Sequence, residues 1–289
     1  MIFSMTGFAA VSGDSPRGRL SLELRAVNAR FLDLQFRIAE ELRAHEPMLR
    51  ELILARVARG KLDCRLFFNQ GTVPPGSQRL NREALGRLRA LADEVKTEFP
   101  EAAPLRIADV LRWPGTLAEA GAADDERLRA AAEQLCRRAL DELLAARARE
   151  GATLAASIGE RAAAMRRRVE DIAPLVPAAI AAYQARLAER LKEAIGSADN
   201  ERLRAEIALF AAKSDVDEEL TRLRAHLGEV ERTLEKGGAV GKRLDFIAQE
   251  LNREANTLAS KAASQPIADC ALELKLLVEQ MREQVQNIE

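Results

Sequence analysis

Apolar and polar residues alternate with a period of two through most of the first 70 positions, a pattern typical of β-strands with one buried face. The segments 19–28, 30–39 and 61–70 show this alternation. The residues expected to face the core are Leu20, Leu22, Leu24, Ala26, Leu32, Leu34, Phe36, Ile38, Leu62, Cys64, Leu66 and Phe68. A further strand is expected at 4–12. A helix is expected at 45–60, because a proline lies near its start and a glycine at its end.

After a loop at 70–80, the apolar positions recur at threes and fours, which indicates helices. We expect helices at 81–98, from about 124 to 195 with a bend at Pro174 and Pro177, from about 200 to 235, and over the last 25 residues or so. The last helix carries apolar residues in heptad spacing from Ile267 to Ile288. This seam packs either within the chain or against a second copy, and periodicity does not distinguish the two.

The predicted fold is α+β. A small sheet domain (strand, strand, strand, helix, strand) is expected over 1–72, with helices in 80–150 as a candidate extension. A mostly α-helical, coiled-coil-like domain is expected over 150–289.

The apolar seam of the predicted 200–235 helix is interrupted at Ser214 and Asp217. Polar groups at core-facing positions cost stability unless they are paired or used. One interpretation is a local helix break capped by Ser214, with Asp217 completing a capping box. The other is that the polar residues serve a function.

Composition and charge narrow the class of protein. Apolar residues make up 47% and aromatic residues 4% of the 289 positions, which favours helices over an all-β fold. The net charge of −1 means that any nucleic acid must be bound by a local basic patch. Three scattered cysteines suit a reducing compartment. No signal peptide and no apolar run of about 20 residues is found, so we expect a cytoplasmic protein without a membrane partner.

A turn near Gly238 would join two antiparallel helices, so that residues equally far from it along the chain lie side by side. His226 would then face Glu250, with Glu254 one turn further along, and Glu219 would share a helical face with His226. An imidazole among carboxylates suits Mn²⁺ or Mg²⁺. The candidate metal ligands are therefore Glu219, His226, Glu250 and Glu254. The alternative is a set of ordinary interhelical ion pairs, each worth at most ~1 kcal/mol.

Two asparagines, Asn252 and Asn256, stand in the same helix although amides have poor helix propensity. Amides bind riboses, bases or the waters of an ion, so Asn252 is a candidate catalytic residue and Asn256 a candidate RNA contact. The preceding turn "EKGGAVGKR" lacks the P-loop spacing. It is either a weak phosphate site, with Lys242 and Arg243, or a simple helix–helix turn. Arg253 is a further candidate phosphate contact.

The outer face of the predicted sheet carries basic and polar residues. Its candidate RNA contacts are Arg25, Asn28, Arg30 and Lys61. The alternative is an ordinary solvated face on which Glu23, Asp33 and Asp63 balance the charge.

Several motifs together resemble the YicC/YloC family of bacterial proteins, and the resemblance covers residues 1–289. The motifs are "SMTGFA", "ELRAVNARFLDL", "RGKLDCRL", "WPG", "SDVDEELTRLRAH", "GAVGKRLDFIAQELNREANTLASK" and "ELKLLVEQMREQVQNIE". The resemblance implies a metal-dependent endoribonuclease of small-RNA and messenger turnover that forms a ring-shaped homo-oligomer, expected to be a hexamer. It also implies that the acidic motifs of the helical region carry the chemistry, here Asp215, Glu218, Glu219, His226, Asp245, Glu250 and Glu254.

The leading hypothesis is hydrolysis of RNA phosphodiester bonds around a divalent cation. The candidate catalytic residues are His226, Glu250, Asn252 and Glu254. The alternative hypothesis is a non-catalytic RNA-binding adaptor that recruits another RNA-decay enzyme, because the sequence contains no compact catalytic motif. Cleavage of labelled RNA by the purified protein, with and without EDTA, would separate the two.

Overall fold

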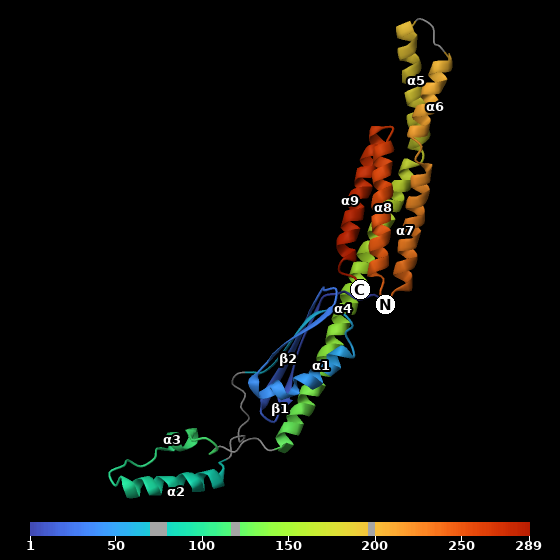
Figure 1. The fold of residues 1–289 in the computed structure, drawn as a ribbon. Coiled ribbons are helices and arrows are strands. Elements are labelled where there is room, and N and C mark those ends of the chain that lie inside the picture. Colours follow the sequence, from blue (N-terminus) through green and yellow to red (C-terminus); the bar gives the residue numbers. More distant parts are fainter. Residues whose placement is uncertain (70–79, 117–121, 196–199) are drawn as a thin grey trace. The chain divides into compact units, whose positions relative to one another are not determined.

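The structure, a computed structural model, describes residues 1–69, 80–116, 122–195 and 200–289. The predicted loop at 70–80 and the turn at 196–200 therefore lie almost entirely outside the described residues. The described chain forms two compact units, one made of Phe8–Leu143 and the other of Met1–Gly7 with Leu144–Glu289. The first contains a sheet and the second is helical (Figure 1), which confirms the predicted α+β fold.

All four predicted strands are present and form one mixed sheet. They are β1 (Gly7–Ser15), β2 (Gly18–Val27), β3 (Leu32–Ile38) and β4 (Gly60–Phe68), in the order β1-β2-β4-β3. Strand β4 is antiparallel to β2 and parallel to β3, so the chain crosses over between β3 and β4. The crossover contains a short 3₁₀ helix, Glu40–His45, and α1, Glu46–Leu54.

One face of the sheet is buried, as the alternation predicted. Leu20, Leu22 and Leu24 of β2 have no exposed surface. They share a core with α1 and with the buried residues from Leu128 to Leu143 of the long helix α4 (Ala122–Ile172). The predicted helix at 45–60 is too long, because α1 ends at Leu54. Gly60 instead begins β4 with a φ of 107°, a conformation that favours glycine.

Two further helices, α2 (Arg82–Glu98) and α3 (Ile107–Arg112), follow the sheet strands in sequence. The predicted 81–98 helix is confirmed. Its N-terminus is fixed by Asn81, whose side chain accepts hydrogen bonds from the backbone N–H groups of Glu83 and Ala84.

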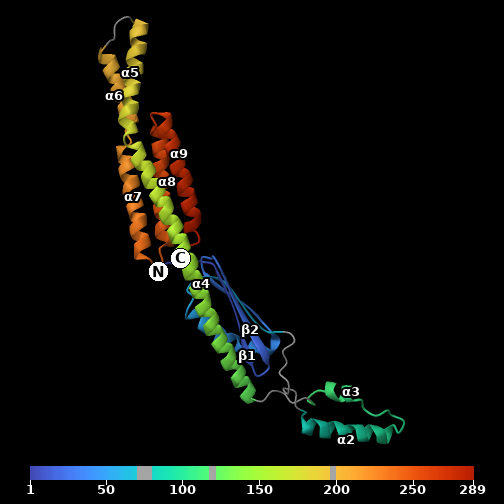
Figure 2. The same cartoon turned by 180° about the vertical axis from the view of Figure 1, so that it is seen from behind.

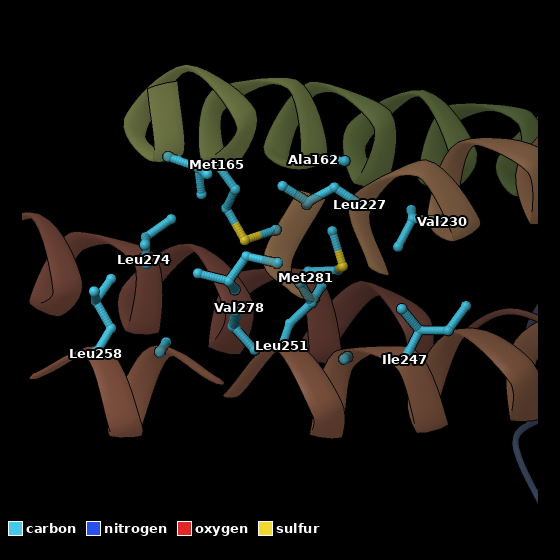
Figure 3. Packing of buried hydrophobic residues seen from close by; sticks show 14 of the residues in the cluster. Ala162, Met165, Leu227, Val230, Ile247, Leu251, Leu258, Leu274, Val278 and Met281 are labelled. Atoms are coloured by element: carbon cyan, nitrogen blue, oxygen red, sulfur yellow. The ribbon is translucent and has the colours of Figure 1, made fainter. Parts of the chain in front are cut away.

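The helical unit contains residues 144–172 of α4 and five further helices: α5 (Leu175–Ile195), α6 (Asn200–Lys213), α7 (Asp217–Lys236), α8 (Gly241–Lys261) and α9 (Gln265–Val285). The bend predicted at Pro174 and Pro177 is a break at Pro174, where α4 has ended and α5 has not yet begun, whereas Pro177 lies within the first turn of α5. Figure 2 shows α4, α7, α8 and α9 running side by side. Their apolar faces meet in one core, part of which is drawn in Figure 3 around Met165, Leu227, Leu251 and Met281.

The heptad seam of the last helix is used within the chain. Its residues from Ile267 to Val285, and Ile288 beyond the helix end, are all buried in this core. The seam therefore has no apolar side chains left over for a second copy to cover.

The helix predicted at 200–235 is two helices, α6 and α7, with a break at 214–216. The break was one of the two interpretations of the polar gap, but the predicted cap is wrong. Ser214 is buried and no side chain caps α7 at Val216. Asp215 Oδ1 instead accepts a hydrogen bond from the N–H of Asp217, at 3.1 Å.

The first residues of the chain pack with the helices and not with the sheet. Ser4 pairs with Ile288 in a β-bridge, and the N–H of Ser4 donates to the carbonyl of Arg147 at 2.9 Å. The buried side chain of Arg147 donates from Nε to the Ser4 carbonyl at 2.6 Å. This placement of residues 1–7 differs from the predicted division, which assigned them to the sheet domain. None of the described helices is both long enough and apolar enough to cross a membrane.

Candidate metal and RNA site

Helices α7 and α8 form an antiparallel hairpin whose turn uses two glycines. Gly237 and Gly238 have φ values of 65° and 84°, which side chains disfavour. The N–H of Gly237 donates to the Thr233 carbonyl at 3.2 Å, and that of Gly238 to the Met1 carbonyl at 3.1 Å. Because the chain itself uses both N–H groups, they are not available to hold a phosphate. At these two glycines the segment therefore matches a simple helix–helix turn, which was the alternative to a phosphate-binding turn.

The hairpin brings together one imidazole and two carboxylates. His226 of α7 and Glu250 and Glu254 of α8 each offer one ligand atom, and these atoms lie within 4.8 Å of one another. His226 and Glu250 are half-buried, whereas Glu254 is only 2% exposed. The arrangement follows from antiparallel pairing, since His226 and Glu250 are equally distant from Gly238 in the sequence. Nitrogen and oxygen donors at this separation fit a hard divalent cation.

Two arginines contact the same carboxylates. Arg253 Nη2 lies 2.6 Å from Glu250 Oε2 and 3.2 Å from Glu254 Oε1. Arg222 Nη1 lies 3.6 Å from Glu254 Oε1. One interhelical ion pair of the alternative interpretation, Arg222–Glu254, is therefore present together with the ligand group, whereas both pairs of Arg253 lie within α8. Both guanidiniums are about half exposed, so they can turn toward solvent when a cation replaces them as the partner of the carboxylates.

The fourth predicted ligand, Glu219, lies outside this group. Its Oε1 accepts a hydrogen bond from Lys261 Nζ at 2.9 Å, and its Oε2 is buried without a hydrogen-bond partner among the residues that the structure describes. Glu219 is 4% exposed. A buried carboxylate needs such a partner, because an unpaired charge is costly inside a protein.

The two asparagines are not part of the ligand group. Asn252 follows Glu250 by two residues, which places it about 200° around the helix axis from the ligands. It is half-buried, and Asn256, one turn further along the same side, is exposed. The asparagines and the carboxylates are neighbours in the sequence, but the helical geometry places them on different sides of α8.

Among the predicted phosphate contacts of the hairpin, Lys242, Arg243 and Arg253 are all exposed. Arg243 donates from Nη2 to Glu229 Oε1 across the hairpin, at 3.1 Å. Glu229 also accepts from Arg232 Nη2, at 2.7 Å. Sequence reasoning missed Glu229 and Arg232, although Glu229 follows His226 by three residues and so shares its helical face.

The predicted RNA contacts of the sheet lie in the other unit. The outer face of the sheet alternates in charge, because Arg25 lies opposite Asp63 and Glu23 opposite Arg65 in the register of β2 and β4. Arg65 is 3.7 Å from Asp63, which is also 3.6 Å from Arg37. This network matches the balanced, solvated face of the alternative interpretation. Of the remaining candidates, Arg30 stacks over Phe31 at 5.2 Å, Lys61 lies opposite Val27 in the sheet, and Asn28 is exposed.

Comparison with known proteins shows which family the chain resembles over its length. Residues 2–156 match the family described as "Endoribonuclease YicC-like, N-terminal region", and residues 172–289 match "Endoribonuclease YicC-like, C-terminal". A protein of Haemophilus influenzae named "Probable endoribonuclease YicC" is 38% identical over the full length of both chains. A protein of Clostridioides difficile with the same name is 28% identical, also over the full length of both. The hairpin with His226, Glu250 and Glu254 lies within the C-terminal match.

Proposed function

The chain belongs to the YicC-like endoribonuclease family, and on that premise we propose that it is a metal-dependent endoribonuclease whose cation is held by His226, Glu250 and Glu254. The observation that carries the proposal is the convergence of these three donors from two helices within 4.8 Å. The two carboxylates fit Mn²⁺ or Mg²⁺, because both ions are bound mainly by oxygen ligands, and His226 adds a nitrogen ligand from the facing helix. A bound ion of this kind would polarise a phosphoryl oxygen and lower the pKa of a bound water.

Other roles in the proposed reaction, positioning of a ligand and contact with the phosphate, fall to side chains of α7 and α8. Glu254 is held in place by burial and by two arginines, which leaves its orientation fixed before a cation binds. Arg222 and Arg253 then have a second use. Once they release the carboxylates, their half-exposed guanidiniums are free to contact the oxygens of an RNA phosphate beside the ligands. Such contacts neutralise charge that develops on the phosphate during cleavage.

The first test is cleavage of 5′-labelled RNA by the purified protein in Mn²⁺, in Mg²⁺ and in EDTA. We expect cleavage with at least one ion, no cleavage in EDTA, and recovery when the ion is returned. Binding of Mn²⁺ by calorimetry gives a readout that does not depend on activity, and His226→Ala should weaken it by about tenfold or more. Cleavage that persists in EDTA would contradict the metal proposal.

The second candidate function is the non-catalytic RNA-binding adaptor, which the ion pairs on Glu250 and Glu254 favour. An adaptor would bind RNA and would not cleave it with any ion. The same experiment therefore separates the two, provided that RNA binding is measured in parallel by fluorescence anisotropy.

We also propose that the protein acts in small-RNA and messenger turnover in the cytoplasm, as a homo-oligomer and specifically a hexamer, together with other RNA-decay enzymes. These finer statements rest on the resemblance of the motifs to the family. Light scattering on the purified protein tests the assembly, and a mass near that of one 31.8 kDa chain would contradict it.

A further inference from the structure

A polar pocket lies at the end of the α7–α8 hairpin where the glycine turn joins the two helices. We call it the turn pocket, and its volume is about 550 Å³. Its charged lining residues are Glu229, Arg232, Lys236 and Arg243. Three cations against one anion make this pocket positive, whereas the metal-ligand group on the same hairpin is acidic. Neither the proposed catalytic mechanism nor the family comparison assigns a role to it.

The cations of the pocket are held in place before any ligand arrives. Glu229 accepts hydrogen bonds from Arg232 at 2.7 Å and from Arg243 at 3.1 Å. These hydrogen bonds lower the pKa of Glu229, so its carboxylate remains charged and keeps both guanidiniums at the pocket wall. Lys236 is exposed and makes no ion pair with any residue that the structure describes. A pocket with two oriented guanidiniums and an uncompensated ammonium is suited to a phosphate group.

The turn pocket continues the face that carries the metal ligands. Glu229 follows His226 by three residues on α7, and Arg243 precedes Glu250 by seven residues on α8. Both spacings keep side chains on one face of a helix. At about 1.5 Å per residue they place the pocket about 5–10 Å along the hairpin from the ligands, near enough for a neighbouring phosphate of the same strand to reach it.

We propose that the turn pocket binds a backbone phosphate of the RNA strand adjacent to the phosphate that is cleaved, with Arg232, Lys236 and Arg243 as its contacts. This inference rests on the proposed function, since it takes the scissile phosphate to lie at His226, Glu250 and Glu254. It adds that the hairpin holds the strand at two successive positions. The pocket thereby sets the position of the strand along the hairpin, and it does so without reading the base sequence.

The first experiment removes two of the cations by the double substitution Arg232→Ala/Lys236→Ala. Affinity for a single-stranded RNA should fall about tenfold at moderate salt, and the slope of log Kd against log salt should fall by about one for each residue removed. The control is Arg167→Ala/Arg224→Ala, which removes the same charge from two exposed arginines of α4 and α7 that do not line the pocket. Unchanged affinity for Mn²⁺ shows that the hairpin remains folded. A pocket variant that binds RNA as the control does would overturn the proposal.

The second experiment identifies the phosphate. RNAs carrying a single neutral methylphosphonate at each position around the cut are bound to the wild type and to the pocket variant. Neutralising one phosphate next to the cut should weaken binding to the wild type and have no further effect on the pocket variant, because the contact is already lost. Additive losses at every position would contradict the pocket. These measurements are made by anisotropy without metal, so a pocket that fails is distinguishable from a protein that does not cleave.

Discussion

His226 and Glu250 face each other across the α7–α8 hairpin, at equal distances in sequence from Gly238. Neither residue is unusual in its own helix. Their proximity depends on the length of the turn, because an insertion of one residue would rotate one helix relative to the other by about 100°. Glu254 completes the group from one turn further along α8 and is nearly fully buried.

Glu250→Gln and Glu254→Gln should each reduce the rate of RNA cleavage by about a hundredfold or more. An amide keeps the shape of the side chain and one acceptor oxygen but loses the charge that holds a divalent cation. RNA affinity measured without metal should remain nearly unchanged. Glu279→Gln is the matched control, since Glu279 is an exposed carboxylate of α9 paired only with the neighbouring Arg282 among the described residues. If both hairpin variants cleave at the wild-type rate, the catalytic site lies elsewhere.

Lys261→Ala should lower the free energy of unfolding by about 2 kcal/mol, measured by urea denaturation. The substitution leaves the buried carboxylate of Glu219 without the partner at 2.9 Å. Losing one member of a fully buried pair costs about 3–5 kcal/mol, but Lys261 is one-third exposed and so contributes less.

Two comparisons test the cause of this loss. The double variant Glu219→Gln/Lys261→Met, which removes the buried charge as well, should recover most of the stability. Arg166→Ala breaks a more exposed pair with Glu231 in the same unit and should cost less than about 1 kcal/mol. Equal losses for Lys261→Ala and Arg166→Ala would show that the burial of Glu219 is unimportant.

Gly151→Ala should destabilise the helical unit by about 2 kcal/mol or more, on the order of an overpacked core. A Cβ at Gly151 would lie 2.3 Å from the Ile2 carbonyl oxygen and 2.8 Å from the Phe3 carbonyl carbon, both of which are backbone atoms. Gly159→Ala on the same helix is the control. Its Cβ would meet only Leu234 Cδ1, at 4.0 Å, so we expect a gain of roughly 0.5–1 kcal/mol from helix propensity. Thermal unfolding followed by circular dichroism separates the two signs.

The native thiols should react slowly at neutral pH. Burial raises the pKa of Cys136 to about 11 and that of Cys270 to about 11, and it raises the pKa of Cys64 as well. Because a raised pKa lowers the fraction of thiolate, alkylation at about pH 8 should be about a hundredfold slower than in the urea-unfolded chain. The rate at Cys270, which is only half-buried, should rise about tenfold per pH unit between about pH 8 and 10. Mass spectrometry of each labelled cysteine provides the measurement, and labelling of Cys270 at the unfolded rate would refute the expectation.

The sequence was sufficient for features that depend on periodicity. The alternation through Leu22 and Cys64 identifies the buried face of the sheet, and the symmetry about Gly238 predicts the meeting of His226 with Glu250. It was insufficient where distant backbone groups decide the structure. The hydrogen bonds that join residues 1–7 to Arg147 produce no periodic pattern in the sequence. The sequence therefore did not predict that these residues belong to the helical unit.

Other failures have a local cause. A pattern of threes and fours continues across a short helix break, so the sequence left the break between α6 and α7 as one of two interpretations and assigned it the wrong cap. Asn252 and Glu250 are close in sequence but lie on nearly opposite sides of α8, and the catalytic role of Asn252 stays a prediction.

The helical unit is assembled from both ends of the sequence, and this has a consequence for how the chain folds as it is made. Phe8–Leu143 leaves the ribosome as one uninterrupted stretch, so it can fold while translation continues. The apolar stripe of α4 beyond residue 144 emerges next and remains uncovered until α9 follows, because Val278 and Met281 are made much later. During that interval the nascent chain exposes a hydrophobic surface, which is the kind of surface that chaperones bind.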